Sequence, residues 1–218
     1  MGAIDAPGED GMRITEQRVL ILNCTLKPSP EESSCQLIAQ QLLDGFTSLG
    51  AVGDVVRVVD LDIAPGVKSD MGGGDQWPSL RTRILDSDIL VIATPTWLGH
   101  MSSVAQRVLE RLDAELSATD DEGRPILFGH VAATAVLGNE DGAHKITADL
   151  HQALNDVGFT LPAQGGTYWN GRAMEKVDYK DLDATPEPVA QANATLVANA
   201  VHLAGVLRER PYPAPGPA

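Results

Sequence analysis

The sequence predicts an α/β fold in which one domain is built on a doubly wound, five-stranded parallel sheet. Two features of the chain carry this prediction. Residues 18–23 and 88–93 are short, nearly continuous apolar runs, which are typical of strands that helices cover on both faces. Segments with apolar residues at helical spacing separate the predicted strands, and strict alternation of strand and helix implies a parallel sheet with helices on both of its faces.

The first strand, at 18–23, is followed by a helix and a second strand. Apolar residues recur at helical spacing through 33–49, where Ser33 or Ser34 can cap the helix and Gly50 can close it. Four valines between residues 54 and 61 then predict the second strand, because β-branched residues favour extended backbone.

The middle of the chain is predicted to continue the alternation after a long connection. Residues 62–78 are rich in glycine and form an irregular segment of a length that is uncommon in compact domains and often has a function. A short helix is predicted at 80–87, the third strand at 88–93, and an amphipathic helix at 102–116.

The last third of the chain supplies two more strands and two more helices. The fourth strand is predicted from about residue 130 to 137, followed by a helix at 143–157 that a glycine ends. A fifth strand lies within 159–169, where proline and glycine interrupt the pattern. The final helix is predicted at 186–207.

Composition narrows the classes of function. The chain has 218 residues, of which 43% are hydrophobic and 21% charged, as in an ordinary globular domain. Its net charge of −14 argues against nucleic acid and against an anionic membrane surface as partners. Two cysteines are too few for a disulfide framework, and the five histidines form no cluster with metal-ligand spacing, so we expect no metal site.

The two ends of the chain are predicted to lie outside the folded domain. Residues 1–17 lack the basic start and apolar centre of a signal peptide, and no apolar stretch reaches the roughly 20 residues of a membrane span, so the expected location is the cytoplasm. We expect a flexible N-terminal segment at 1–17, a single domain at 18–207 and a proline-rich tail at 208–218.

Five strands in this arrangement suggest the flavodoxin-like strand order 2-1-3-4-5. In that order a flavin site lies where the chain reverses its direction across the sheet, between the first and third strands. The loops that follow the first, third and fourth strands are therefore expected to meet at one edge.

The first of these loops has the residues of a phosphate site. It leads into the N-terminus of the predicted helix at 33–49, where free N–H groups and the helix dipole favour an anion. The site residues predicted here are Thr25, Lys27, Ser33, Ser34 and Cys35. The loop lacks the glycines of a Walker A loop and of a dinucleotide fingerprint, and taken alone it also suits a simple capped turn.

The second loop presents an aromatic ring after a buried strand. Its side chains offer an apolar wall, and its backbone N–H groups can reach the heteroatoms of a flat aromatic cofactor. The site residues predicted here are Pro95, Thr96, Trp97, Leu98 and Gly99. The alternative is a structural loop with a tryptophan packed on the sheet.

The third loop follows the fourth strand and is flanked by glycines, which let the backbone approach a ligand closely. The site residues predicted here are Gly138, Asn139, Glu140, Asp141, Gly142 and His144. An ordinary strand-to-helix turn is the alternative for this loop as well.

Together, in this order, the three loops resemble the flavodoxin-like NAD(P)H-dependent FMN reductases, which include the NAD(P)H:quinone oxidoreductases. The resemblance covers residues 18–207. Residues 89–103 are similar to the family's strand–Pro-Thr/Ile-Tyr/Trp-x-Gly–helix segment. Thr25-Leu26-Lys27 and Ser33-Ser34 are similar to its Gly-Ser-x-Arg…Ser-Asn-Thr phosphate loop. Four residues depart from that second pattern, namely Cys24, Lys27, Ser34 and Cys35.

The resemblance implies bound FMN, with NADH or NADPH as co-substrate and a quinone or another small acceptor as the final substrate. It implies no general acid or base, because the flavin carries the reactive atoms. It also implies a homo-oligomer, and an aromatic closure of the flavin or nicotinamide pocket by Tyr168 or Trp169.

Two other functions stay open at this point. A flavodoxin-type carrier would bind FMN without its own NAD(P)H activity. An interaction protein on the same scaffold would have lost the cofactor. Cys35, near a helix N-terminus, is also open to a reactive-thiol interpretation. Trp77 can either cover the site or anchor the long segment before it.

Overall fold

The computed structural model describes residues 16–173 and 175–214. Most of the predicted N-terminal segment, residues 1–15, and the last four residues of the predicted tail lie outside the described residues, whereas the first two residues of that tail belong to the final helix, which ends at Glu209. The helices and strands are β1 (Arg18–Asn23), α1 (Ser34–Ser48), β2 (Val52–Arg57), η1 (Val58–Asp60), α2 (Trp77–Leu85), β3 (Ile89–Trp97), β4 (His100–Met101), α3 (Ser103–Leu112), η2 (Asp113–Ser117), β5 (Val131–Gly138), α4 (Ala143–Asp156), β6 (Gly166–Asn170), η3 (Tyr179–Asp181) and α5 (Glu187–Glu209). None of the helices in the described part of the chain is long and apolar enough to cross a membrane.

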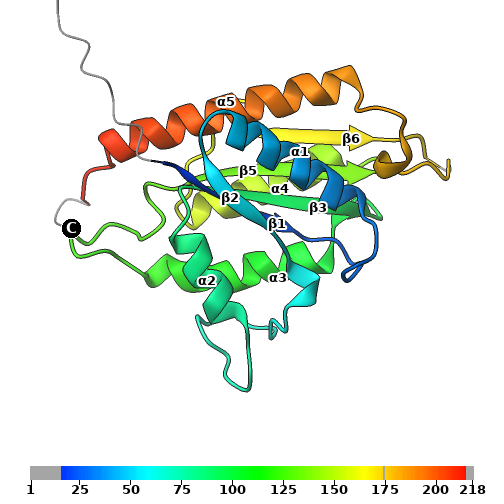
Figure 1. Cartoon of the computed structure of the whole chain (residues 1–218). Helices are drawn as coiled ribbons and strands as arrows, with labels where there is room; N and C mark the ends of the chain where they lie inside the picture. Colours follow the sequence, from blue (N-terminus) through cyan, green and yellow to red (C-terminus); the bar gives the residue numbers. More distant parts are fainter. Residues whose placement is uncertain (1–15, 174, 215–218) are drawn as a thin grey trace, which may run out of the picture.

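The predicted fold class is confirmed. The sheet has the order β2-β1-β3-β5-β6 with parallel pairing along this path, which is the predicted 2-1-3-4-5 order once the short β4 is set aside. Helices α1 and α5 cover one face, and α2, α3 and α4 cover the other (Figure 1). Each face therefore has its own apolar core, which explains the near-continuous apolar runs in β1 and β3.

The second strand begins and ends earlier than predicted. It was expected at 54–61, but β2 ends at Arg57 and residues 58–60 form a single 3₁₀ turn. Gly53 is part of the strand because its backbone passes close to β1: a Cβ at this position would overlap the carbonyl oxygen of Val19. Glycine usually weakens a strand, but this position requires glycine because the two backbones approach each other closely.

The third strand is longer than predicted. It was expected to end at Ala93, but residues 94–97 stay extended, and Pro95 still pairs with Leu137 of β5. The chain then turns at Leu98 and Gly99, whose φ angles of 51° and 73° are both positive, as a type I′ hairpin turn requires. The short strand β4 follows and pairs antiparallel with the end of β3.

Helix boundaries differ from the predictions by a few residues. Helix α2 begins at Trp77 rather than at residue 80, because Pro78 is compatible with the first turn of a helix. Helix α3 ends at Leu112 and continues as a 3₁₀ turn to Ser117, where a single helix to residue 116 was expected. The fifth strand was expected within 159–169 but is confined to Gly166–Asn170.

The segment between η1 and α2 is held down by a buried ion pair. The guanidinium of Arg111 lies 2.8 Å from the carboxylate of Asp75, and both side chains are fully buried. The same guanidinium donates hydrogen bonds to the carbonyl oxygens of Ala64 and Lys68. It also lies over the ring of Trp77, which is buried in the core, so this tryptophan anchors the segment and does not cover the site.

Candidate functional site

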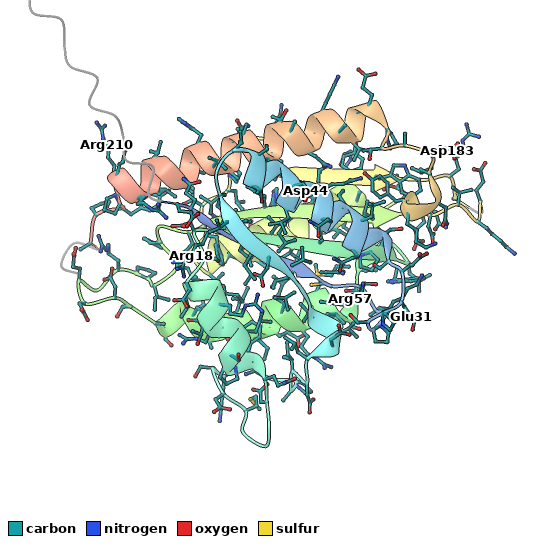
Figure 2. The ribbon with its side chains drawn as sticks, in the orientation of Figure 1. Arg18, Glu31, Asp44, Arg57, Asp183 and Arg210 are labelled. Atoms are coloured by element: carbon teal, nitrogen blue, oxygen red, sulfur yellow. The ribbon has the colours of Figure 1, made fainter. Side chains whose placement is uncertain are left out.

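The loop after β1 is shaped by side chains of its own and of β2. The side chain of Asn23 accepts a hydrogen bond from the N–H of Thr25 (3.1 Å), and the hydroxyl of Thr25 accepts one from the N–H of Lys27 (3.3 Å). At the end of β2, Arg57 donates to the carbonyl oxygen of Glu31 (2.8 Å), and the two residues lie together at the same end of the sheet in Figure 2. The loop is therefore fixed before any ligand binds.

The loop leads directly into the N-terminus of α1. Ser33 holds the N-cap position, as predicted, but within the described residues its hydroxyl makes no capping bond to the helix. The first turn of α1 contains no acidic residue that would neutralise the positive end of the dipole. A hydroxyl that does not cap the helix and an N-terminus without acidic residues in its first turn together suit a phosphate group.

The end of β3 is tied to the loop after β1 by hydroxyl groups. Ser102 donates a hydrogen bond to the carbonyl oxygen of Cys24 (2.6 Å), and its own N–H donates to the hydroxyl of Thr94 (3.1 Å). Ser102 also accepts from the N–H of Ala105 and so caps α3. One buried serine therefore positions two of the three predicted loops relative to each other.

The loop after β5 packs against the hairpin formed by β3 and β4. A Cβ on Gly142 would lie only 2.8 Å from the Cα of Gly99, and one on Gly138 would lie 2.7 Å from the Cβ of Thr96. The carboxylate of Glu140 accepts a hydrogen bond from the N–H of Leu98 (2.7 Å). The two glycines therefore let this loop approach the hairpin closely, while the approach of its backbone to a ligand stays a prediction.

These loops line one cleft of about 200 Å³ at the carboxyl ends of β1, β3 and β5. Figure 1 shows the arrowheads of these strands and the N-terminal end of α1 at the same side of the molecule. The predicted site residues that line the cleft are Thr25, Lys27, Ser33, Ser34, Cys35, Pro95, Thr96, Trp97, Gly138, Asn139 and Glu140. The three loops therefore meet as predicted.

Five predicted site residues are not among those that line the cleft in the described part of the chain, namely Leu98, Gly99, Asp141, Gly142 and His144. Leu98 points into solvent and is 89% exposed, while Gly99 and Gly142 contact each other. The side chain of Asp141 accepts a hydrogen bond from the adjacent N–H of Gly142. The ring of His144 packs edge-on against Tyr168, with centroids 4.9 Å apart.

The structure adds a wall that the sequence did not indicate. Asp178 and Tyr179 line the cleft from the segment before α5, and Leu26 and Leu137 contribute from neighbouring positions. The hydroxyl of Tyr179 donates to the side chain of Gln41 (2.8 Å), and its ring lies 5.7 Å from that of Trp169. Aromatic residues are scarce in this chain, so an isolated tyrosine in a connecting segment was the available signal.

Of the two aromatic residues predicted to close the pocket, Trp169 lines the cleft and Tyr168 does not. Trp97, on the opposite wall, is 55% exposed. The cleft therefore has flat apolar surfaces from β3 and from β6, with polar groups at the end near α1.

Both thiols near the cleft are buried. Burial raises the pKa of Cys35 to about 12, and neither the hydrogen bond with Ser33 nor the charge of Lys27 offsets this effect. Burial also raises the pKa of Cys24 well above its usual range. Both thiols stay protonated at neutral pH, which argues against the reactive-thiol interpretation of Cys35. The residues in the described ranges form no cluster of three metal-ligating side chains.

The residues of the cleft fit FMN. Hydroxyl groups, Lys27 and the N-terminus of α1 suit a phosphate, and the tryptophan and proline surfaces suit a flat ring system. The hydroxyl of Thr96 is buried in the wall, and no described residue serves as its hydrogen-bond partner. A buried hydroxyl of this kind is costly unless a ligand satisfies it.

Comparisons with known proteins agree with this geometry. The family model of NADPH-dependent FMN reductases matches residues 17–175. The 8-demethyl-8-aminoriboflavin-5'-phosphate synthase of Streptomyces davaonensis is 33% identical over 207 residues, which cover 89% of this chain and 80% of that protein. The divalent metal cation transporter MntH of Mycobacterium bovis is 36% identical over 209 residues, which are 93% of this chain but only 30% of the transporter's length.

Solved structures of similar fold are found as well. The structure of RosB with its bound intermediate 8-demethyl-8-formylriboflavin-5'-phosphate superimposes with a TM-score of 0.82 at 32% identity, covering 90% of this chain and 82% of that one. The apo form of the NADH:FMN oxidoreductase EMOB shares the fold, with a TM-score of 0.60 at 18% identity and coverage of 90% and 92%.

Proposed function

The chain belongs to the NADPH-dependent FMN reductase family, and from this premise we propose that it transfers hydride from NADH or NADPH, through bound FMN, to a quinone or another small acceptor. The observation that carries the proposal is the cleft itself: polar groups at a helix N-terminus and flat apolar walls meet at the carboxyl ends of β1, β3 and β5. This is where ligands bind in open α/β sheets.

Different residues of the cleft would bind the phosphate and the ring system of FMN. Thr25, Ser33, Ser34 and Lys27 would hold the phosphate, with the N–H groups at the start of α1. Pro95, Trp97 and Trp169 would orient the ring system between the two walls and exclude water from its faces. Flavin, when bound, supplies the reversible two-electron chemistry.

No side chain of the cleft needs to act as a general base in this proposal. Burial keeps the two thiols protonated, and the fixed backbone dipoles of residues 138–140, which line the cleft, would act on a bound ring. The chain's contribution is thus binding, orientation and exclusion of water.

The test begins with FMN binding and continues with reduction. Titration of the purified protein with micromolar FMN, followed by tryptophan fluorescence, should give saturable quenching, because Trp97 and Trp169 lie in the cleft. Anaerobic stopped-flow mixing with NADH or NADPH should then bleach the visible flavin absorbance rapidly. Absence of binding contradicts the proposal, and binding without bleaching supports an electron carrier.

A second function is favoured by the similarity to a synthase of an aminoriboflavin phosphate, which is 33% identical to this chain. RosB is an enzyme of the same kind, and its structure, at 32% identity, holds the intermediate 8-demethyl-8-formylriboflavin-5'-phosphate. In that function the flavin would be a substrate that the protein modifies. Chromatography of the flavin after turnover separates the two: unchanged FMN supports the reductase, and a flavin of new mass supports modification.

Homo-oligomerisation remains part of the proposal. The chain has exposed apolar side chains near the mouth of the cleft, at Leu26, Trp97 and Leu98. Sedimentation analysis should give a mass of at least twice the 23.1 kDa of one chain. A monomer would contradict this part of the proposal and would leave FMN binding unaffected.

A further inference from the structure

Glu140 connects two walls of the cleft. It lies in the loop between β5 and α4, its side chain is partly buried, and it lines the cleft. One oxygen of its carboxylate accepts a hydrogen bond of 2.7 Å from the N–H of Leu98, at the tip of the β3–β4 hairpin. The acceptor is an ionisable side chain and the donor is backbone, so the pair fixes where the carboxylate lies.

The hairpin tip that Glu140 holds is conformationally restricted. Leu98 has a φ of 51°, a conformation that is unfavourable for residues other than glycine. The next residue, Gly99, lies against Gly142, where a Cβ would come within 2.8 Å of the Cα of Gly99. The turn therefore depends on its external contacts, and the hydrogen bond from Leu98 to Glu140 is one of them. Loss of the acceptor would loosen the wall that carries Thr96 and Trp97.

Glu140 also places negative charge in the ring end of the cleft. Lys27 lies with the hydroxyls near α1, whereas Glu140 lies with Pro95, Trp97 and Asn139. Within residues 16–173 and 175–214, no Lys or Arg is paired with Glu140. Its charge is thus balanced by a backbone N–H dipole but not by a cation.

An uncompensated carboxylate distinguishes the two redox states of a flavin. Reduction adds two electrons and either one or two protons, so the reduced ring is anionic when only one proton is taken up. A neighbouring negative charge raises the free energy of that anion and has much less effect on the neutral oxidised ring.

We propose that Glu140 is a positioning residue that makes this site bind oxidised FMN more tightly than reduced FMN. The inference rests on the proposed function, since it requires FMN in the cleft. By linkage, weaker binding of the reduced form lowers the two-electron potential of the bound flavin and favours passage of its electrons, or of the reduced flavin itself, to the next acceptor.

Three variants separate charge from geometry. Glu140→Gln removes the charge and keeps a carbonyl oxygen that can accept from Leu98. Glu140→Ala removes both. Glu175→Gln is the matched control, because it removes one charge from a neighbouring exposed side chain that does not line the cleft.

The measurement is the dissociation constant of oxidised FMN and of dithionite-reduced FMN, each followed by tryptophan fluorescence, the second under anaerobic conditions. In Glu140→Gln the ratio of the reduced to the oxidised constant should fall about tenfold, the scale of removing one charge from the wall of a partly open site. Tenfold corresponds to a rise of about 30 mV in the two-electron potential. The oxidised constant should change less than about twofold.

Glu140→Ala should show the same fall in the ratio, and it should also bind oxidised FMN several-fold more weakly. Glu175→Gln should match the wild type in both constants. A ratio in Glu140→Gln within twofold of the wild type would overturn the inference, as would an equal change in Glu175→Gln. Wild-type protein that binds neither form would overturn the proposed function, whereas normal binding of oxidised FMN with an unchanged ratio would overturn this inference alone.

Discussion

Thr96 offers a test in which stability and binding change in opposite directions. Its hydroxyl is buried in the wall of the cleft and has no partner among the described residues. Thr96→Val replaces that hydroxyl with a methyl group of similar size. If the hydroxyl stabilises the fold, the variant protein should be less stable than the wild type. If the hydroxyl instead binds a ligand, the variant protein should be more stable and should bind FMN more weakly.

The magnitudes follow from the burial of the hydroxyl. An unpartnered buried polar group costs about 1–3 kcal/mol. The new methyl group packs against backbone, since a Cβ built on Gly138 would lie 3.0 Å from this oxygen, so we take the lower end. The free energy of unfolding should rise by about 1 kcal/mol, which is about 2–4 °C in Tm for a domain of this size. Loss of one hydrogen bond to FMN should weaken binding by about three- to tenfold.

The assay compares Tm of the flavin-free protein with the dissociation constant of FMN. Thr167→Val is the control, because the hydroxyl of Thr167 is equally buried and lacks a described partner, yet Thr167 does not line the cleft. The control should be stabilised and should bind FMN like the wild type. Unchanged FMN affinity in Thr96→Val would refute the reasoning, and so would a fall in its Tm.

Three further predictions concern the phosphate end, the buried ion pair and acid stability. Lys27→Ala should weaken FMN binding about fivefold, the modest effect of an exposed cation, and should not change riboflavin binding; equal losses for both ligands in parallel titrations would place the phosphate elsewhere. Arg111→Met leaves the Asp75 carboxylate buried without its cation, so urea titration should show a loss of about 3–5 kcal/mol in unfolding free energy, and a loss below about 1 kcal/mol would contradict the role of the pair. Burial lowers the pKa of His130 below 6.5. Below about pH 6.5 His130 is therefore protonated more readily in the unfolded chain than in the folded chain, and the free energy of unfolding should decrease as the pH falls. His130→Gln should flatten this decrease between about pH 7 and pH 5, and an unchanged slope would exclude His130 as its source.

Apolar patterning was sufficient to predict the strand order and the meeting of the three loops. The runs at 18–23 and 88–93 indicate strands covered on both faces, and in a doubly wound sheet the carboxyl ends of such strands share an edge. The N-cap of α1 also follows from local chemistry, because Ser33 was one of the two serines predicted to cap this helix.

Features that depend on contacts between distant segments were not predicted. Arg111 lies on the inner face of α3, but helical spacing gives no sign that Asp75, far away in the sequence, neutralises it. Tyr179 becomes part of the cleft through its bond to Gln41 in α1. The hairpin after β3 contains a leucine, Leu98, with a positive φ, which is unfavourable for residues other than glycine. The hydrogen bond to Glu140, which is distant in the sequence, supports this conformation.

The pairing of Arg111 with Asp75 has a consequence for how sequences of this kind can diverge. Either side chain without the other would be an unpaired charge in the core. Neither residue can therefore be substituted while the other is retained. Related sequences should therefore keep both residues or exchange both together for apolar ones. Those that exchange them should also shorten or rebuild the stretch from Ala64 to Lys68, whose carbonyl oxygens lose their donor in the same event.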